Sequence, residues 1–404
     1  GFITPSVPFA ERWFIDMKER LKKEFQEIFQ IPAERVFFSP GRVNLIGEHI
    51  DNNGGIVLPC AITYGTYGAA AKRKDRKICF YSDNFKDKGV IQADLDGLEY
   101  TEKDDWANYA KGVIFFMQQA GCRIPCGLDI LIAGNIPNGA GLSSSASLEV
   151  LIGTMINDMF GLGRTPLEIV QLSKKAENEF IGVNCGIMDQ FIIGMGKKDH
   201  AVALNTATLE YDYIPVHLKG SCIVIMNTNK RRGLADSKYN ERLQESQTAF
   251  NRLKQSLEIQ HLCDLEPADF EKYAGLIKDP VHRRRARHAV MENARVKAAV
   301  EALRQGDIQR FGQLMNASHV SLRDDYEVTG KELDTLVESA WKQPGVLGAR
   351  MTGAGFGGCA IALVEEDKVD TFMEHVNNEY TDAIGYAPDF YKASIGSGAK
   401  RLDD

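Results

Sequence analysis

The sequence has no long apolar run, no paired-cysteine motif and no strong net charge, and each absence excludes a class of protein. No stretch approaches the roughly 18 apolar residues of a membrane span, so we expect a cytoplasmic protein that contacts no membrane. The eight cysteines form no C-x-x-C pair, and the closest two are Cys122 and Cys126. This spacing favours free thiols over zinc or disulfide chemistry. The net charge of −7 argues against general electrostatic binding to nucleic acid.

Two further absences exclude well-known nucleotide-binding folds. The chain contains no G-x-x-x-x-G-K-[ST] segment, which excludes the Walker A loop, and it lacks the H-R-D and D-F-G elements of protein kinases. The run Gly353–Gly358 does match G-x-G-x-x-G, but a dinucleotide-binding fingerprint must open a helix. Because Cys359–Val364 is predicted to be a strand, we interpret the run as a glycine turn between strands, close to a ligand or to the other domain.

The composition is that of an ordinary globular protein, with 44% hydrophobic and 25% charged residues among 404. Domains commonly hold about 100–200 residues, so we divide the chain into an N-terminal domain, residues 1–210, and a C-terminal domain, residues 211–404. No flexible linker marks this boundary. Apolar periodicity and turn residues predict helices over 11–30, 106–120, 148–159, 166–180, 236–257, 284–305 and 368–380, and strands over 35–39, 56–63, 66–71, 77–82, 128–133, 211–216, 222–227, 348–351, 359–364 and 390–394. Thr165-Pro166 predicts a cap and a first helical position.

A glycine- and serine-rich loop lies between the predicted strand 128–133 and the helix 148–159. From Pro137 to Ala146 it contains two glycines and three consecutive serines. Glycines let successive backbone N–H groups approach a ligand, and the helix that follows adds unpaired N–H groups and the positive end of its dipole. The serine hydroxyls can contact phosphate or a metal ion. The pattern fits a site for a nucleotide phosphate, and it also fits a capped helix after an irregular turn.

A second polar cluster, Gly41–Gly55, lies between two predicted strands. Arg42 can neutralise phosphate, while Glu48, His49 and Asp51 can bind the hydroxyl groups of a sugar or another polyol. One imidazole without a spaced partner histidine is a poor zinc site. On these residues alone, a solvated turn with local ion pairs is the alternative.

These two segments and the glycine turn Gly353–Gly358 closely resemble the three signature motifs of the GHMP small-molecule kinases. Within that superfamily the first segment resembles the galactokinases. Four more segments are similar to galactokinases: Ala176–Phe180, Asn184–Phe191, Ser318–Glu327 and Arg350–Cys359. The resemblance extends over almost the whole chain. It implies an α+β fold with two domains, in which mixed sheets pack with helices, the second domain has ferredoxin-like elements, and the active site lies in the cleft between the domains.

The resemblance also implies a function, the ATP-dependent transfer of a phosphoryl group to the anomeric hydroxyl of galactose. Asp189 would be the catalytic carboxylate and Arg42 its partner. A carboxylate near its ordinary pKa of about 4 is a weak base, so Asp189 would orient the hydroxyl and accept its proton late, while Arg42 stabilises developing charge. Mg²⁺ would be held by Ser145 and Glu177. The implied sugar-binding residues are Glu48, His49, Ile50, Asp51, Gly186 and Tyr239. The implied ATP-binding residues are Gly139, Ala140, Gly141, Leu142, Ser143, Ser144 and Ser145, with Ser82 and Trp106 beside adenine.

The sequence departs from the usual galactokinase signature at Ile50 and Asn52, where Thr and Tyr are common. These departures leave N-acetylgalactosamine and arabinose open as alternative sugars. A sugar and ATP sensor without transferase activity is a further alternative, but the complete serine run Ser143–Ser147 favours the enzyme. We expect a monomer that does not bind nucleic acid, and we interpret the basic run 282–288 as a solvated or internally paired helix.

Overall fold

The structure is a computed structural model that describes residues 9–136, 140–231, 233 and 235–402. Its helices are α1 (Phe9–Phe29), α2 (Ala107–Gln119), α3 (Ser144–Met159), α4 (Pro166–Lys175), α5 (Met188–Met195), α6 (Ala235–Lys254), α7 (Pro267–Tyr273), α8 (Pro280–Arg304), α9 (Ile308–Ser321), α10 (Gly330–Lys342) and α11 (Val369–Ile384). Its strands are β1 (Arg35–Asn44), β2 (Ile56–Val57), β3 (Pro59–Lys72), β4 (Lys77–Ser82), β5 (Ile91–Asp94), β6 (Leu128–Gly134), β7 (His200–Asn205), β8 (Tyr211–Pro215), β9 (Ser221–Asn227), β10 (Val346–Thr352), β11 (Cys359–Glu365), β12 (Asp389–Ala393) and β13 (Lys400–Arg401).

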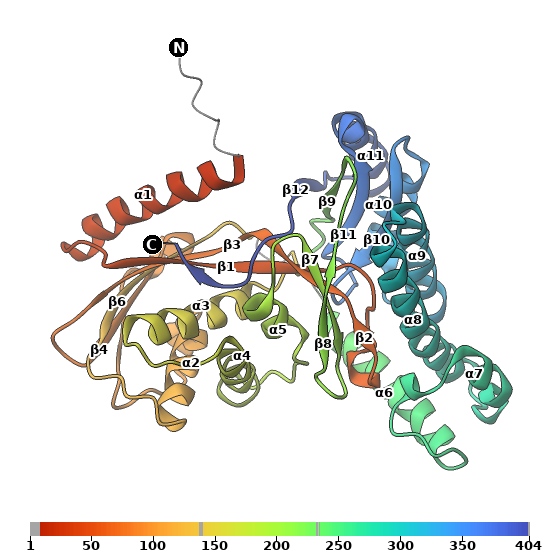
Figure 1. Ribbon diagram of the computed structural model, residues 1–404, viewed down its shortest axis with the longest axis horizontal. Coiled ribbons are helices and arrows are strands. Elements are labelled where there is room, and N and C mark those ends of the chain that lie inside the picture. Colours follow the sequence, from red (N-terminus) through yellow and green to blue (C-terminus); the bar gives the residue numbers. More distant parts are fainter. Residues whose placement is uncertain (1–8, 137–139, 232, 234, 403–404) are drawn as a thin grey trace.

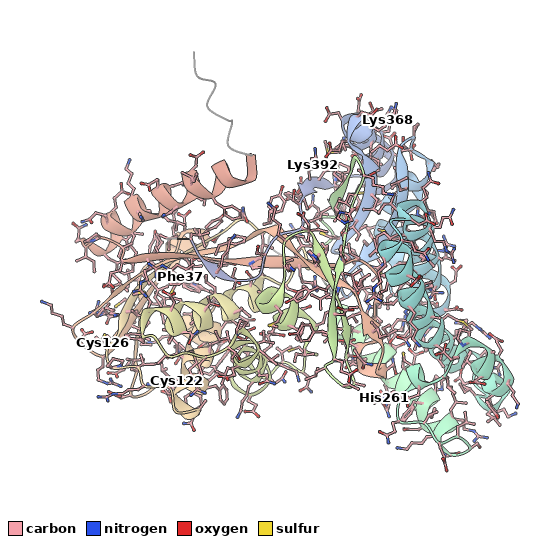
Figure 2. The ribbon with its side chains drawn as sticks, in the orientation of Figure 1. Phe37, Cys122, Cys126, His261, Lys368 and Lys392 are labelled. Carbon is pink, nitrogen blue, oxygen red and sulfur yellow. The ribbon has the colours of Figure 1, made fainter. Side chains whose placement is uncertain are left out.

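A six-stranded sheet forms the centre of the N-terminal half, residues 9–205 (Figure 1). Its order is β13-β1-β3-β6-β4-β5, and β4 and β6 are its parallel pair. Side chains alternate between the two faces of a strand. Phe37, labelled in Figure 2, packs in the core with α2 and α3, whereas Val36 and Phe38 pack on the opposite face beneath α1. β6 is paired with β3 on one side and with β4 on the other, so the loop that follows β6 starts from a fixed position at the end of the sheet.

β3 is one continuous strand where the sequence predicted two, over 56–63 and 66–71. Gly65, which we took for part of a turn, stays paired with Pro40 of β1. A Cβ on Gly65 would come within 2.1 Å of the backbone oxygen of Ser39. The glycine thus permits the close approach of two strands, and the predicted break between the strands was wrong for this reason.

A four-stranded antiparallel sheet of order β10-β11-β9-β12 forms the centre of the C-terminal half, residues 211–402. Val224 and Met226 of β9 pack in a core with α10 and α11, while Ile223 and Ile225 face the other way, into a core that both halves share. Gly353–Gly358 connects β10 to β11. It is a turn between strands, as predicted. The molecule has an α+β fold in which mixed sheets pack with helices, as the sequence predicted.

The two halves are connected at two places. β8 pairs with β7, so the predicted boundary at residue 210 lies in the turn between two paired strands, and the division into domains stays a prediction. At the other end of the chain, β13 returns to the N-terminal half and pairs with β1. The backbone N–H of Leu402 donates to Val36 O at 2.8 Å.

The start of α4 and the basic run confirm two smaller predictions. Thr165 caps α4 with its side chain, and Pro166 is the first helical residue. In the run 282–288 on α8, Arg285 is buried and forms ion pairs with Glu245 and Glu327. The basic side chains of this run thus have partners within the chain.

The cysteines all carry free thiols. Cys122 is buried and Cys126 is partly exposed, and Figure 2 shows both in the N-terminal half, far from α8 to α11. Among the described residues, no helix is both long and apolar enough to cross a membrane.

Candidate active site

The glycine- and serine-rich loop leads from β6 into α3 and brings hydroxyl groups to the helix N-terminus. Gly139 lies outside the described residues, so the described part of the loop begins at Ala140. Ser143 precedes α3 in the left-handed region, with φ 65°, and its buried Oγ has no hydrogen-bond partner among the described residues. Ser144 is exposed and Ser145 is half-buried. A helix N-terminus beside an unpaired hydroxyl suits an anionic group such as phosphate.

Arg42 of β1 links this loop to Asp189. Its Nη1 donates to Gly141 O at 2.9 Å, and its backbone N–H donates to Leu142 O at 3.2 Å. Its Nε donates to Asp189 Oδ1 at 2.8 Å, and the Asp189 side chain remains 35% exposed. Burial lowers the pKa of Arg42, but Asp189 and Glu48 raise it above its ordinary value, so the guanidinium stays charged. The predicted catalytic pair and the predicted phosphate loop therefore meet.

Glu177 lies on a π turn, Ala176–Ile181, that follows α4 and faces the start of α3. Ser145 Oγ donates to Glu177 Oε1 at 3.5 Å. Beside it, Glu149 of α3 is fully buried, and its Oε1 accepts from Gln190 Nε2 at 3.3 Å. Burial and then Glu177 raise the pKa of Glu149 well above its ordinary value. The Oε2 atoms of both glutamates accept no hydrogen bond from other described residues, but Glu149, which its raised pKa keeps protonated, can donate to Glu177.

These oxygen atoms fit the Mg²⁺ that the sequence resemblance implied. Mg²⁺ takes oxygen ligands and is often held by one or two protein groups together with phosphate and water. The hydroxyl of Ser145 and the carboxylate of Glu177 are such a pair, and the unpartnered Oε2 of Glu177 can accept a further bond. Within the described ranges, no three His, Cys, Asp or Glu side chains form a group that could hold a metal ion.

Glu48 is the most heavily bonded member of the predicted sugar-binding set. Its Oε1 accepts from Gly353 N at 2.9 Å, and from Arg350 Nη1 and Thr352 Oγ1 at 3.4 Å each. Burial raises the pKa of Glu48, and the positive charge of Arg350 opposes this rise. The third motif thus contacts the first one directly, and residues of both halves meet at this carboxylate.

His49, the next residue, is held by one hydrogen bond and by two aromatic rings. Its Nε2–H donates to Ala354 O at 2.9 Å, and its ring lies 5.6 Å from the ring of Tyr239 and 5.1 Å from that of Tyr326. Burial lowers the pKa of His49 to about 3, so the imidazole is neutral at physiological pH. It can position neighbouring groups but cannot supply a positive charge.

Asp51 is a predicted sugar residue that lies close enough to Asp189, the predicted catalytic carboxylate, for their charges to interact. Burial, and then the charges of Glu48 and Asp189, raise the pKa of Asp51 to about 6. Gly186 lies against it, since a Cβ on Gly186 would come within 2.6 Å of Asp51 Oδ2. Burial and the charge of Asp51 raise the pKa of Tyr239. The structure therefore brings these predicted sugar residues together with Asp189.

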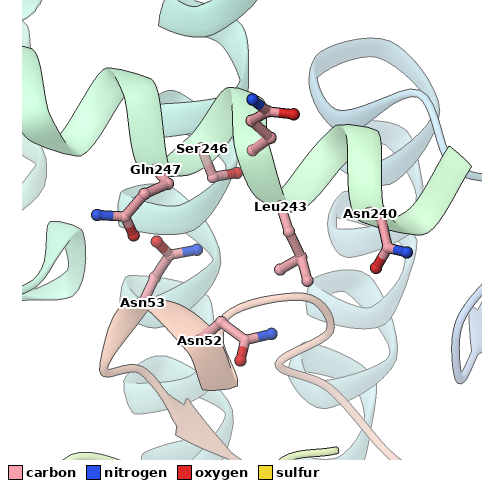
Figure 3. A pocket seen from close by; sticks show the side chains of 7 residues that line it. Asn52, Asn53, Asn240, Leu243, Ser246 and Gln247 are labelled. Carbon is pink, nitrogen blue, oxygen red and sulfur yellow. The ribbon is translucent and has the colours of Figure 1, made fainter. Parts of the chain in front are cut away.

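The two departures from the usual signature, Ile50 and Asn52, have different surroundings. Ile50 is fully buried in the shared core, and its predicted contact with the sugar stays a prediction. Asn52 is exposed, and its Nδ2 donates to Tyr239 Oη at 3.3 Å. It lines a hollow of about 470 Å³ between its own turn and α6, and Figure 3 shows Asn53 and Gln247 facing each other across it. The hollow is also lined by Asn240, Leu243, Gln244 and Ser246.

Ser82 and Trp106, predicted to lie beside adenine, occupy the end of β4 and the residue before α2. Ser82 Oγ accepts from Asn84 N at 3.2 Å, and Asn84 Nδ2 donates to the backbone oxygen of Gly134, the last residue of β6, at 2.9 Å. Trp106 packs edge-on against Phe80, and its buried Nε1 has no partner among the described residues. Ser82 is therefore close to the start of the phosphate loop, and contact of either residue with adenine stays a prediction.

Sequence reasoning assigned no role to three buried charged residues that surround this site. Arg350 of β10 is fully buried and donates to Asn44 O at 2.7 Å as well as to Glu48. Glu149 lies beside the predicted metal-binding pair, and Glu292 of α8 is fully buried next to the sugar-binding segment. For Glu149 a signal was available, because a charged residue within an apolar helical stretch must find a partner.

Comparison with known proteins identifies the family. A family model described as the galactokinase galactose-binding signature matches residues 23–72, and models of the N-terminal and C-terminal GHMP kinase domains match residues 108–197 and 299–382. The galactokinase of Ligilactobacillus salivarius (strain UCC118) is 58% identical over 385 residues, which are 95% of this chain and 100% of that protein. The galactokinase of Enterococcus faecalis (strain ATCC 700802 / V583) is 57% identical over 386 residues, 96% of this chain and 100% of that protein.

A solved structure agrees with these sequence matches. The crystal structure of Lactococcus lactis galactokinase complexed with galactose superposes with a TM-score of 0.91 at 52% identity, covering 96% of this chain and 100% of that one. Both its fold and its sequence are similar to those of this chain over nearly the full length. On these grounds, this chain belongs to the galactokinase family of the GHMP kinases.

Proposed function

We propose that this chain phosphorylates the anomeric hydroxyl of galactose with ATP, giving galactose 1-phosphate and ADP and so bringing galactose into carbohydrate metabolism. ATP is the phosphoryl donor of the kinase family to which the chain belongs. The observation that carries the proposal is the position of Arg42, which bonds both Asp189 Oδ1, at 2.8 Å, and Gly141 O, at 2.9 Å. Because of these two contacts, the proposed catalytic carboxylate lies next to the proposed phosphate loop.

The sugar is bound, in this proposal, by Glu48, His49, Ile50, Asp51, Gly186 and Tyr239. Carboxylates accept hydrogen bonds from sugar hydroxyls, and the neutral His49 is fixed beside them. The proposal is supported by the proximity of Asp51 to Asp189 and Tyr239, and by the galactose complex of the related Lactococcus lactis protein. The anomeric hydroxyl would then face Asp189, on the side of the phosphate loop.

Catalysis is assigned to Asp189 and Arg42. Phosphoryl transfer depends chiefly on positioning and on neutralisation of charge. Asp189 orients the acceptor hydroxyl and accepts its proton as the new P–O bond forms, and its partial exposure lets that proton pass on to water. Arg42, buried and charged, stabilises the negative charge that develops on the transferred group.

ATP is bound, in this proposal, by the loop from Gly139 through Ala140, Gly141, Leu142, Ser143 and Ser144 to Ser145. Ser82 and Trp106 contact the adenine. Ser145 and Glu177 hold Mg²⁺, which when bound neutralises phosphate charge. The unpartnered oxygens of Ser143 and Glu177 support this assignment, because buried polar atoms normally have partners.

The test is an assay of sugar-dependent ADP release with magnesium-ATP and a panel of galactose, N-acetylgalactosamine and arabinose. We expect the highest kcat/KM for galactose, with galactose 1-phosphate as the product. A preference for either of the other sugars would contradict the proposed substrate. No ADP release at all despite sugar binding would support the sensor instead, and ADP release that does not depend on any sugar would contradict both the proposed kinase and the sensor. Gel filtration tests the expected monomer.

A further inference from the structure

We propose that Glu292 of α8 is a positioning residue for the sugar, which acts by fixing the backbone of the segment that carries Glu48. Glu292 is fully buried. Its Oε2 accepts from two consecutive backbone N–H groups, those of Gly47 at 3.3 Å and of Glu48 at 3.2 Å. The inference rests on the proposed function, because it concerns how the same sugar site is built.

The two remaining bonds of Glu292 hold its carboxylate in place. Ser318 Oγ of α9 donates to Oε2 at 2.5 Å, and Arg295 Nε, one helical turn along α8, donates to Oε1 at 2.7 Å. Burial raises the pKa of Glu292, but the charges of Arg295, His288 and Arg350, together with the hydrogen bond from Ser318, lower the pKa by more, to about 2. The carboxylate is therefore ionised, and a charged acceptor forms stronger hydrogen bonds than a neutral one.

The backbone at Gly47 depends on this contact. Gly47 has φ 98°, a conformation that residues with a side chain rarely adopt, and a Cβ there would come within 2.9 Å of Val296 Cγ2 on α8. The segment therefore turns sharply against α8 and directs two successive amides at the single oxygen Oε2. Without a buried anion at this point, two amides that cannot reach water would lose their partner.

The turn determines where the Glu48 side chain lies. His288, also on α8, contacts Glu48 O through its Nε2 at 3.0 Å, so helix α8 holds Glu48 at both its amide and its carbonyl. The carboxylate of Glu48 is held separately, by Arg350 and Gly353. Glu292 does not belong to the proposed sugar-binding set, yet a shift of its carboxylate moves the backbone from which Glu48 extends.

The experiment compares Glu292→Gln and Glu292→Asp with a matched control, Arg295→Gln. The control removes the cation that bonds Oε1, while Oε2 keeps its two amide partners, and Arg350 and Ser318 still favour the ionised carboxylate. For both Glu292 variants we expect the KM for galactose to rise about tenfold or more, because small misplacements of binding groups are costly, while the KM for ATP stays within twofold. For Arg295→Gln we expect a lower Tm with both KM values within twofold of the unaltered protein.

Two outcomes would overturn the inference. In the first, both Glu292 variants keep the KM for galactose within twofold. In the second, the KM values for galactose and ATP rise together, and equally in the Arg295→Gln control, which would show a merely structural role. If Glu292→Gln does not fold, Glu292→Asp, which keeps the charge but shortens the side chain, decides the question alone.

Hydrogen exchange supplies an independent readout. Protection of the amides in residues 45–50 should fall in the Glu292 variants and persist in Arg295→Gln, and unchanged protection in the Glu292 variants would contradict the inference. A protein with no activity toward galactose would refute the proposed function, whereas the exchange result would still decide the role of Glu292.

Discussion

The sugar-binding segment and the phosphate loop are built in opposite ways. Around Glu48 the carboxylate oxygen Oε1 already has partners within the chain, and they come from distant positions such as Arg350 and Gly353, although Arg350 Nη2 has no partner among the described residues. Around the loop, Ser143 Oγ and one carboxylate oxygen each of Glu149 and Glu177 lack partners among the described residues. Buried polar atoms without partners are rare in folded proteins. We infer that the chain preorganises the proposed sugar side, whereas the proposed phosphate side is left for a ligand to complete.

This difference has a consequence for binding. A preorganised site loses little conformational freedom when its ligand arrives. We therefore expect substitutions on the sugar side to act on the affinity for galactose, and substitutions on the phosphate side to act on the requirement for metal ion and ATP.

Asp189→Asn should have the largest effect, because this residue lies between the two regions. The amide keeps the size of the side chain but cannot accept the proton, so we expect kcat to fall by about 10³-fold or more. Galactose binding, measured by calorimetry, should stay within a few-fold. Full turnover in this variant would refute the assigned role.

Glu177→Gln tests the phosphate side. We expect the Mg²⁺ concentration for half-maximal rate to rise on the order of 10–100-fold, because a neutral amide is a weaker ligand than a carboxylate. The KM for galactose should not change. Glu179→Gln is a matched control on the same π turn, since Glu179 is exposed and pairs with Lys175. Equal effects of the two substitutions would contradict a metal-binding role for Glu177.

The pH dependence of the KM for galactose tests the role of Asp51 on the proposed sugar side. Burial and the nearby charges of Glu48 and Asp189 raise its pKa to about 6. The carboxylate is therefore ionised at pH 7 and becomes protonated as the pH falls through 6, where it loses capacity to accept a hydrogen bond from a hydroxyl. We expect the KM for galactose to rise about tenfold between pH 7 and pH 5, as follows from a single titration. A KM that is constant over this range would contradict the assignment.

Asp51→Asn is the variant that accompanies this measurement. It should show a raised KM for galactose without the pH dependence. A folded-state pKa above the ordinary value means that the fold favours the protonated form, so Asp51 reduces stability progressively as the pH rises from 3.8 to about 6, and by the full amount above that. The neutral Asn should therefore raise Tm at pH 7.5 and change it less at pH 4.

Asn52→Tyr should have the smallest effect on galactose. The larger side chain restores the residue that is common in the signature and occupies part of the hollow beside α6. We expect kcat/KM for galactose to change by about twofold or less, because removal of one exposed neutral hydrogen bond costs little. We expect the hollow to admit bulky substituents of the sugar, so galactose derivatives that carry them should react more slowly with the variant than with the unaltered chain. A faster reaction would contradict this expectation.

The sequence predicted much of what depends on local pattern. The cap at Thr165, the strand after Gly358 and the buried face of α3 follow from short-range spacing, and each was confirmed. Helix α9, which lies where we predicted no element, carries polar residues such as Ser318 and His319 on its buried face, so its apolar periodicity is weak. Helix α10 was also missed, although Leu333, Leu336, Val337 and Ala340 repeat at helical spacing.

The roles of Glu292 and Arg350 could not be predicted from pattern at all. Each contacts the sugar segment across more than 240 residues of chain. Their surroundings are fixed only when both halves pack together, and a charged residue on a long charged helix such as α8 is usually exposed. The assignments of Ser82 and Trp106 likewise stay predictions, because adenine contacts leave no mark on local structure.

The return of the chain end to the first sheet restricts how the two halves can move. The polypeptide crosses between them once near β8 and again after β12, where Gly396 N donates to Ala61 O at 2.9 Å before β13 pairs with β1. A rigid body that is attached at two points can rotate only about the line through both. We therefore expect any relative motion of the halves, as ligands enter and leave, to be limited to rotation about that one axis.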